Sequence, residues 1–188
     1  MRNLSSIRYL ALFVVVACGS DPVSYSQPVG IELKAKSGDT VSNVITEDKA
    51  ITTESGNPYG AFVAAARVEL DRDPGRITVD QVELLLGAGS VGVVGLGEIF
   101  IGDVEILFQM NDTNNTLPVV AIPIDANTTA GPIAVDSEFD SDDAGADDFD
   151  KLVGGSFKVV MRGTAAAGFV TKGADANIQA TFTFAAFE

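Results

Sequence analysis

Alternation of apolar and polar residues over short segments is the feature that most constrains how this chain can fold. In the segment 177–184, Ile178, Ala180, Phe182 and Phe184 alternate with the polar residues between them. Successive side chains of a strand point to opposite faces, so this segment is expected to be a strand buried on one side. Similar segments recur along the chain, at 31–36, 77–86, 104–110, 117–124, 133–135 and 157–162.

No long segment has the 3.6-residue period of a helix, and turn-forming residues separate the strand-like segments. Roughly seven to nine short strands at such spacing are typical of an antiparallel β-sandwich. We therefore predict an all-β fold, an antiparallel Greek-key (immunoglobulin-like) β-sandwich with one or two single-turn helices. One of these helical turns is expected within 96–101.

Residues 59–70 are compatible with two structures. Three consecutive alanines at 64–66 would tolerate a helix, but apolar residues at alternate positions favour a strand. The sequence Asp-Pro-Gly at 73–75 would then turn this strand into the next one, at 77–86. We predict a β-hairpin over this part of the chain.

Two further details of the strands can be predicted. The apolar pattern changes face between Val79 and Val82, which indicates a β-bulge near Asp80. Pro118 and Pro123 lie within one strand-like segment. Proline has no backbone N–H for a neighbouring strand, so this segment is expected at the edge of a sheet.

The first 18 residues follow a different pattern. Arg2 and Arg8 precede an unbroken apolar run from Leu10 to Val16, and this run ends in Val15-Val16-Ala17-Cys18. The run is far shorter than the about 20 apolar residues that a membrane-spanning helix needs. Cys18 is the only cysteine of the chain, so it cannot form an internal disulfide. The segment resembles the signal peptide of a bacterial lipoprotein, in which the lipobox cysteine receives the lipid.

The resemblance implies cleavage after Ala17 and attachment to the membrane through a lipid on Cys18. It divides the chain into a signal peptide at 1–17, a lipidated tether at 18–28 and a single β-sandwich domain at 29–188. Gly19, rather than an aspartate, follows the cysteine, which implies an extracytoplasmic location on the bacterial cell envelope, at the outer membrane. The alternative is an ordinary secretory signal, because small residues flank Cys18 on both sides.

The net charge of the chain limits the classes of partner that it can bind. Its 12 basic and 26 acidic residues give a net charge of −14. Such a surface repels phosphate groups, so nucleic acid is excluded as a partner. Hard cations such as calcium are more suitable partners, because carboxylate oxygens bind them.

Missing residue types exclude most familiar enzyme chemistry. The chain has no histidine, and its one cysteine is the predicted lipidation site. It therefore lacks the side chains for Ser-His-Asp, Cys-His and histidine-zinc sites. We predict no catalytic residues and a non-enzymatic binding, adhesion or structural module whose partner is a surface protein or a polymer. The alternatives are a subunit of a surface assembly and a glycoside hydrolase that uses paired carboxylates.

The acidic segment 136–150 holds eight acids and no base. Part of it resembles an EF-hand calcium loop, in which Asp140, Asp142, Gly145 and Asp148 would occupy the first, third, sixth and ninth positions. Ala144 and Lys151 depart from the pattern at the fifth and twelfth positions. We predict that Asp140, Asp142 and Asp148 bind Ca²⁺ weakly, with a Kd on the order of 0.1 to 1 mM. The alternative is a solvated acidic loop.

Overall fold

The computed structural model describes residues 23–188 of the chain. This part contains two α-helices, α1 (Pro58–Leu70) and α2 (Ala146–Gly154), and three short 3-10 helices, η1 (Ser37–Asp39), η2 (Leu96–Glu98) and η3 (Ser141–Asp143). Its strands are β1 (Ser24–Lys36), β2 (Val44–Ile51), β3 (Arg76–Leu86), β4 (Phe100–Met110), β5 (Thr116–Ile124), β6 (Ile133–Asp140), β7 (Phe157–Ala165) and β8 (Asp175–Phe187).

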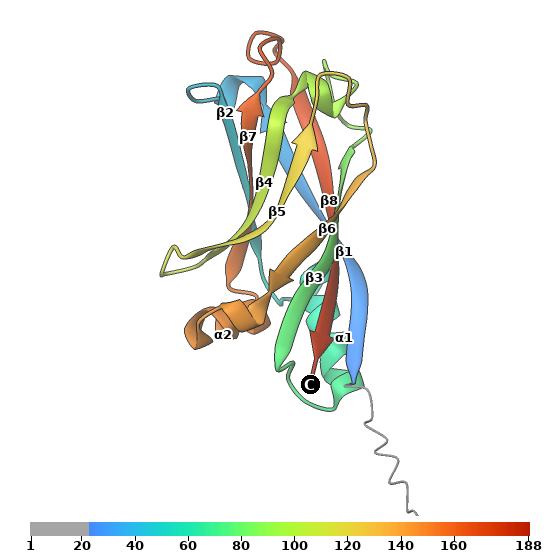
Figure 1. The fold of residues 1–188 in the computed structure, drawn as a ribbon, viewed down its shortest axis with the longest axis vertical. Coiled ribbons are helices and arrows are strands. Elements are labelled where there is room, and N and C mark those ends of the chain that lie inside the picture. The colour runs from blue at the N-terminus through green and yellow to red at the C-terminus, as the bar shows by residue number, and fades with distance from the viewer. Residues whose placement is uncertain (1–22) are drawn as a thin grey trace, which may run out of the picture.

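The strands form two antiparallel four-stranded sheets that pack face to face (Figure 1). One sheet has the order β1-β8-β3-β6 and the other β2-β7-β4-β5. The first strand therefore pairs with the last, the second with the seventh, the third with the sixth and the fourth with the fifth. This nested pairing is the jelly roll, which consists of two Greek keys. The predicted antiparallel β-sandwich is confirmed, and its strand order is that of the jelly roll rather than of an immunoglobulin domain.

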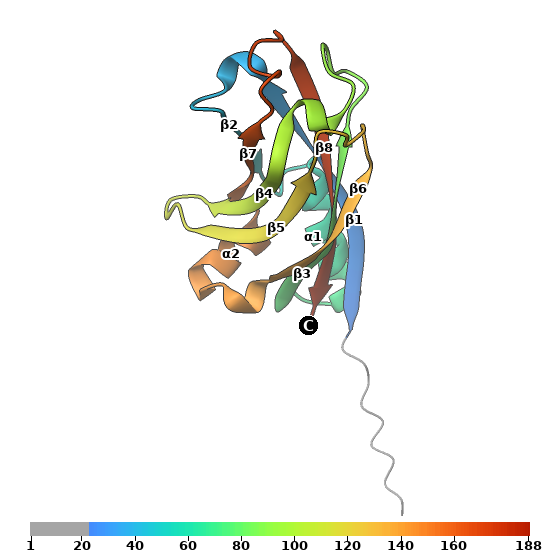
Figure 2. The same ribbon diagram turned by 45° about the horizontal axis from the view of Figure 1, so that its top comes forward.

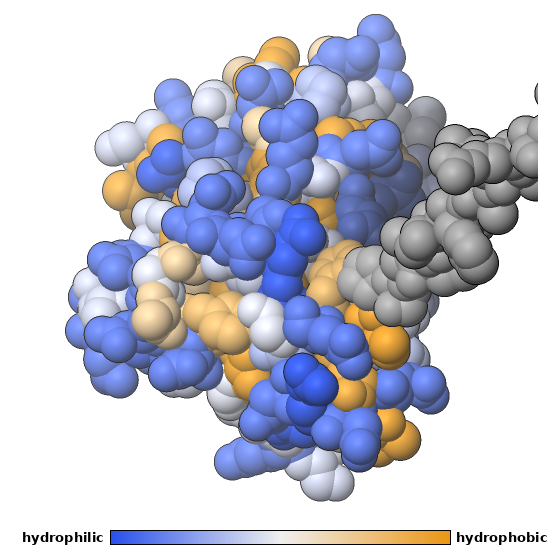
Figure 3. Space-filling view, turned by 60° about the horizontal axis from the view of Figure 1, so that its bottom comes forward, coloured by the Kyte–Doolittle hydropathy of each residue, from blue (hydrophilic) through white to orange (hydrophobic). Residues whose placement is uncertain are grey.

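The connections divide between the two ends of the sandwich (Figures 1 and 2). One end carries four loops, at 37–43, 87–99, 125–132 and 166–174. The opposite end carries α1 and α2, and both the start of β1 and the end of β8 lie there. Seen from this second end, the surface is mostly hydrophilic, with small apolar patches between polar side chains (Figure 3).

Inward-facing side chains of both sheets form one continuous core. Phe108 of β4 lies near its centre, with its ring centroid 5.0 Å from that of Phe157 on β7 and 5.0 Å from that of Phe139 on β6. Phe182 and Phe184 of β8 contact the same ring from the opposite sheet. The alternation identified in the sequence thus corresponds to the buried faces of the two sheets.

The prediction of a strand over 59–70 is wrong, because this segment is the helix α1. The side chain of Asn57 caps the helix by accepting a hydrogen bond of 3.0 Å from the Tyr59 amide, and Pro58 occupies the first turn. Asp71 ends the helix in the left-handed conformation. The buried residues of α1 follow helical spacing: Tyr59, Phe62, Val63, Ala66 and Leu70.

Both helices are longer than the single turns that were predicted. α1 has 13 residues and α2 has nine, and α2 lies in the segment that was expected to be part of an acidic loop. The predicted helical turn within 96–101 is confirmed as η2. Among residues 23–188, no helix is long and apolar enough to cross a membrane.

The strand β1 begins at Ser24, so the second half of the expected tether belongs to the sheet. Pro28 is accommodated opposite Thr183 because β1 is an edge strand that pairs with β8 alone. The predicted signal peptide and the lipidation site Cys18 lie outside the described residues.

Two predicted details of the strands are confirmed. The pairing register of β3 shifts between Val79 and Gln81, which is the bulge expected near Asp80. The strand with Pro118 and Pro123 is β5, and it is an edge strand of its sheet.

Candidate functional site

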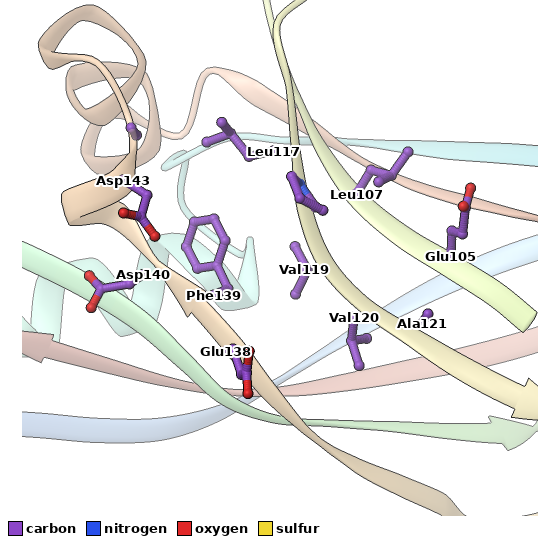
Figure 4. Close-up of a pocket in the computed structure, with 12 residues that line it drawn as sticks. Glu105, Leu107, Leu117, Val119, Val120, Ala121, Glu138, Phe139, Asp140 and Asp143 are labelled. Carbon is purple, nitrogen blue, oxygen red and sulfur yellow. The ribbon is translucent and has the colours of Figure 1, made fainter.

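A cleft lies along the seam where β5, the edge of one sheet, meets β6, the edge of the other (Figure 4). Its volume is about 460 Å³. Apolar residues supply most of its lining: Leu107, Leu117, Pro118, Val119, Val120, Ala121, Phe139 and Ala144. The remaining lining residues are carboxylates: Glu105, Glu138, Asp140 and Asp143.

Both edge strands carry an extra residue where they border the cleft. In β5, Pro118 pairs with Leu107 and Val120 with Ile106, so Val119 between them has no partner on β4. In β6, two residues separate Phe139 from Asp136, whereas only Asp80 separates their partners on β3. Bulges of this kind bend an edge strand and redirect its side chains, and they are frequent beside functional sites.

The two bulges are joined by a hydrogen bond between the sheets. The Ser137 hydroxyl donates to the carbonyl oxygen of Val119 at 2.8 Å. The same hydroxyl accepts a hydrogen bond of 3.2 Å from the Phe139 amide. Because Phe139 packs its ring against Phe108 in the core, the floor of the cleft is held to the centre of the sandwich.

The carboxylates stand around the rim of the cleft. Glu105 lies near one end, Asp140 and Asp143 lie near the other, and Glu138 projects from β6 between them (Figure 4). The site therefore combines an apolar floor with negative charge at several points of its border.

Arg76 at the start of β3 holds Asp140. The Arg76 Nε donates to both carboxylate oxygens of Asp140, at 2.9 and 3.0 Å, and its Nη2 also contacts this carboxylate. The guanidinium lies over the Phe187 ring, 5.2 Å from the centroid, and 3.5 Å from Asp142. Hydrogen bonding to Arg76 lowers the pKa of Asp140, and the same contact raises the pKa of Arg76.

The other rim carboxylates differ in their partners. Glu105 forms an ion pair with Arg162 of β7, with 2.6 Å between Oε2 and Nη2. Among the described residues, Glu138 and Asp143 form no ion pair, and both are exposed. Two negative charges at the cleft are thus left without a cation from the described part of the chain.

The predicted calcium ligands lie in two separate places. Asp140 and Asp142 are close to one another, but Arg76 stands between them and provides the positive charge. Asp148 is buried in α2, where its Oδ2 accepts a hydrogen bond of 3.0 Å from Asn115 and its Oδ1 lies 3.9 Å from Lys151. Within residues 23–188, no group of three or more metal-ligating side chains is found. Calcium binding stays a prediction.

Catalysis by paired carboxylates would need one acid that keeps its proton near neutral pH, and thus has a raised pKa. The pKa of Asp140 is instead lowered by Arg76. The Oε2 oxygen of Glu105 accepts hydrogen bonds from both Nε and Nη2 of Arg162. A carboxyl group with a lowered pKa is ionised near neutral pH, so Asp140 is unsuited to the role of the general acid.

Sequence reasoning did not identify this cleft. It depends on β5 and β6 lying side by side at the seam, which is a long-range relationship between edges of two different sheets. Two signals were present in the sequence: prolines in the β5 segment, and acids at alternate positions of β6, namely Asp136, Glu138 and Asp140. Neither signal indicates that the two strands lie side by side and line one cleft.

The sequence matches no protein-family model. No curated protein matches it either.

Proposed function

We propose that this chain is a lipid-anchored, non-enzymatic binding module of the bacterial cell envelope. The observation that carries the binding role is the cleft between β5 and β6, where facing bulges border an apolar floor. Two carboxylates that line it, Glu138 and Asp143, have no ion-pair partner among residues 23–188. Pockets of roughly 300 to 1,000 Å³ with an apolar lining and a few polar groups are typical ligand sites. The volume of about 460 Å³ falls in this range.

The anchor is proposed from the lipobox at 15–18, and the geometry of the domain is compatible with it. Five residues separate Cys18 from Ser24, where β1 begins. A chain of that length spans at most about 20 Å. A lipid on Cys18 would therefore hold the end of the sandwich with α1 near an extracytoplasmic membrane surface, which we take to be the outer membrane. The cleft would lie along the side of the domain.

The anchor and the binding role are tested by separate experiments. Mass spectrometry of the native protein should find an acylated amino terminus at Cys18, and Cys18→Ser should release the protein from membranes. A membrane-bound Cys18→Ser variant, or an unmodified amino terminus, would contradict the anchor.

A photo-crosslinking residue introduced at Ala121 tests the binding role in intact cells. Ala121 is exposed and lines the cleft, so a crosslinker there should capture a defined partner. Ala50 is the matched control, because it is an exposed alanine on β2, the opposite edge of the same sheet. Equal capture from both positions, or none from Ala121, would contradict a binding role for the cleft.

A further inference from the structure

We propose that the cleft binds an extended segment of a partner protein in which lysine or arginine residues flank aliphatic ones. This inference rests on the proposed binding function and specifies the chemistry of the ligand.

The cleft is long enough to hold a short peptide in an extended conformation. Five consecutive residues of β5, 117–121, line it. At about 3.3 Å per residue, such a stretch is about 13 Å long, which matches four or five residues of an extended chain. The exposed or half-buried side chains along it are apolar: Leu117, Pro118, Val120 and Ala121. Aliphatic side chains of a ligand would remove these surfaces from water.

The charges of the cleft favour a cationic ligand. Glu138 and Asp143 have no ion-pair partner among residues 23–188, whereas the two nearby arginines are already engaged by Asp140 and Glu105. The carboxylates are distributed along the rim rather than gathered at one point (Figure 4). Basic side chains at separated positions of a segment would match this distribution, and the net charge of −14 would favour their approach.

Other ligand classes fit less well. Phosphate-bearing ligands would be repelled by the rim carboxylates. Sugars usually stack on exposed aromatic rings, but Phe139 is the one aromatic residue in the lining and is only 7% exposed. A small aliphatic amine shares the required chemistry, so it has to be distinguished from a protein segment by experiment.

The test uses the mature chain and the capped peptide Gly-Lys-Val-Ala-Val-Lys-Gly, with binding measured by isothermal titration calorimetry at low and moderate salt. Three comparison ligands are a peptide with Glu in place of Lys, a peptide with Ser in place of Val, and spermidine. We expect the basic aliphatic peptide to bind most tightly and to weaken as salt rises. The peptide with Glu should not bind.

Two variants with the same charge change locate the site. Glu138→Gln with Asp143→Asn should weaken binding by about tenfold, because both unpaired carboxylates are lost. Glu69→Gln with Asp175→Asn should leave the Kd within about twofold, since both residues are exposed acids outside the cleft. Ala121→Trp should weaken binding by filling the cleft, and unchanged thermal unfolding would show that this variant folds.

Three results would overturn the proposal. They are absence of binding, equal loss in the two double variants, and equal affinity for the peptide with Ser. Spermidine binding as tightly as the peptide, with the same sensitivity to Glu138→Gln, would assign the cleft to a small amine instead. If the peptides fail while crosslinking at Ala121 succeeds, the ligand chemistry is wrong and the binding function stands.

Discussion

The hydroxyl of Ser137 on β6 donates a hydrogen bond of 2.8 Å to the carbonyl oxygen of Val119 on β5. These two residues belong to different sheets, and each lies in a bulge of an edge strand. The bond joins the sheets at the seam that is open to the candidate binding cleft.

Ser137→Ala should lower the free energy of unfolding by about 1 kcal/mol, because the Val119 carbonyl loses its donor from the opposite sheet. Denaturant unfolding followed by circular dichroism would measure the change. Ser137→Thr keeps the hydroxyl on a residue that suits a strand, so it should retain most of the stability. Equal destabilisation by both variants would show that the hydrogen bond is not the cause.

Asp140 should make stability depend on pH. Its pKa lies below the ordinary value of 3.8 in the folded protein because Arg76 binds the ionised form. The stabilisation is therefore fully present above the unfolded-state pKa and is lost as pH falls through the lowered one. We expect Asp140→Asn to lower the free energy of unfolding by about 1 to 2 kcal/mol at pH 7 and by much less near about pH 2.

Urea unfolding over this pH range would measure the effect of Asp140→Asn. Asp175→Asn is the control, because Asp175 is exposed and forms no ion pair within residues 23–188. A difference between the wild type and Asp140→Asn that stays constant with pH would contradict the proposed role of the ion pair.

Asp148→Ala should destabilise the protein by about 1 to 3 kcal/mol, because the hydrogen bond from Asn115 to the buried, charged Asp148 carboxylate would be lost. Asp147 provides a closely matched control, since it is exposed and belongs to the same first turn of α2. Asp147→Ala should cost at most about 1 kcal/mol, the usual contribution of an acid at a helix amino terminus. Thermal and chemical unfolding of both variants would distinguish the loss of a buried hydrogen bond from the loss of a favourable interaction with the helix dipole.

Calcium binding at Asp140 and Asp142 would have to compete with Arg76. We expect calorimetry to show weak binding to the wild type and a lower Kd for Arg76→Ala, in which both carboxylates are released. Asp148→Asn should not change the affinity, because Asp148 faces Asn115 and Lys151 instead. No heat of binding with either the wild type or Arg76→Ala would rule out this site.

The sequence predicted the class of the fold because alternation reports which face of each strand is buried. The bulge near Asp80 changes this alternation locally. Pro118 and Pro123 indicate an edge strand, because proline has no backbone N–H to donate to a neighbouring strand. These features depend on one strand and its immediate neighbours, so they can be recognised without knowing the arrangement of the sheets.

The helix α1 could not be recognised in this way. Its segment is rich in small residues, and its apolar positions are compatible with a period of two as well as with a period of 3.6. The structure resolves the ambiguity through contacts with distant residues. Tyr59 donates a hydrogen bond of 2.9 Å to the Leu152 carbonyl of α2, and Phe62 stacks on Phe184 of β8 with 5.3 Å between centroids.

By itself, then, the sequence determined that the described domain is an antiparallel sandwich, where one bulge lies and which strand is an edge. Only the tertiary structure decided the jelly-roll strand order, the helix α1 and the cleft between β5 and β6. The physical reason is that hydrophobic periodicity records whether a side chain is buried, but it does not record against which distant residue. Glu138 and Leu117 border one cleft because two sheet edges meet in space, and no local pattern of the chain encodes that meeting.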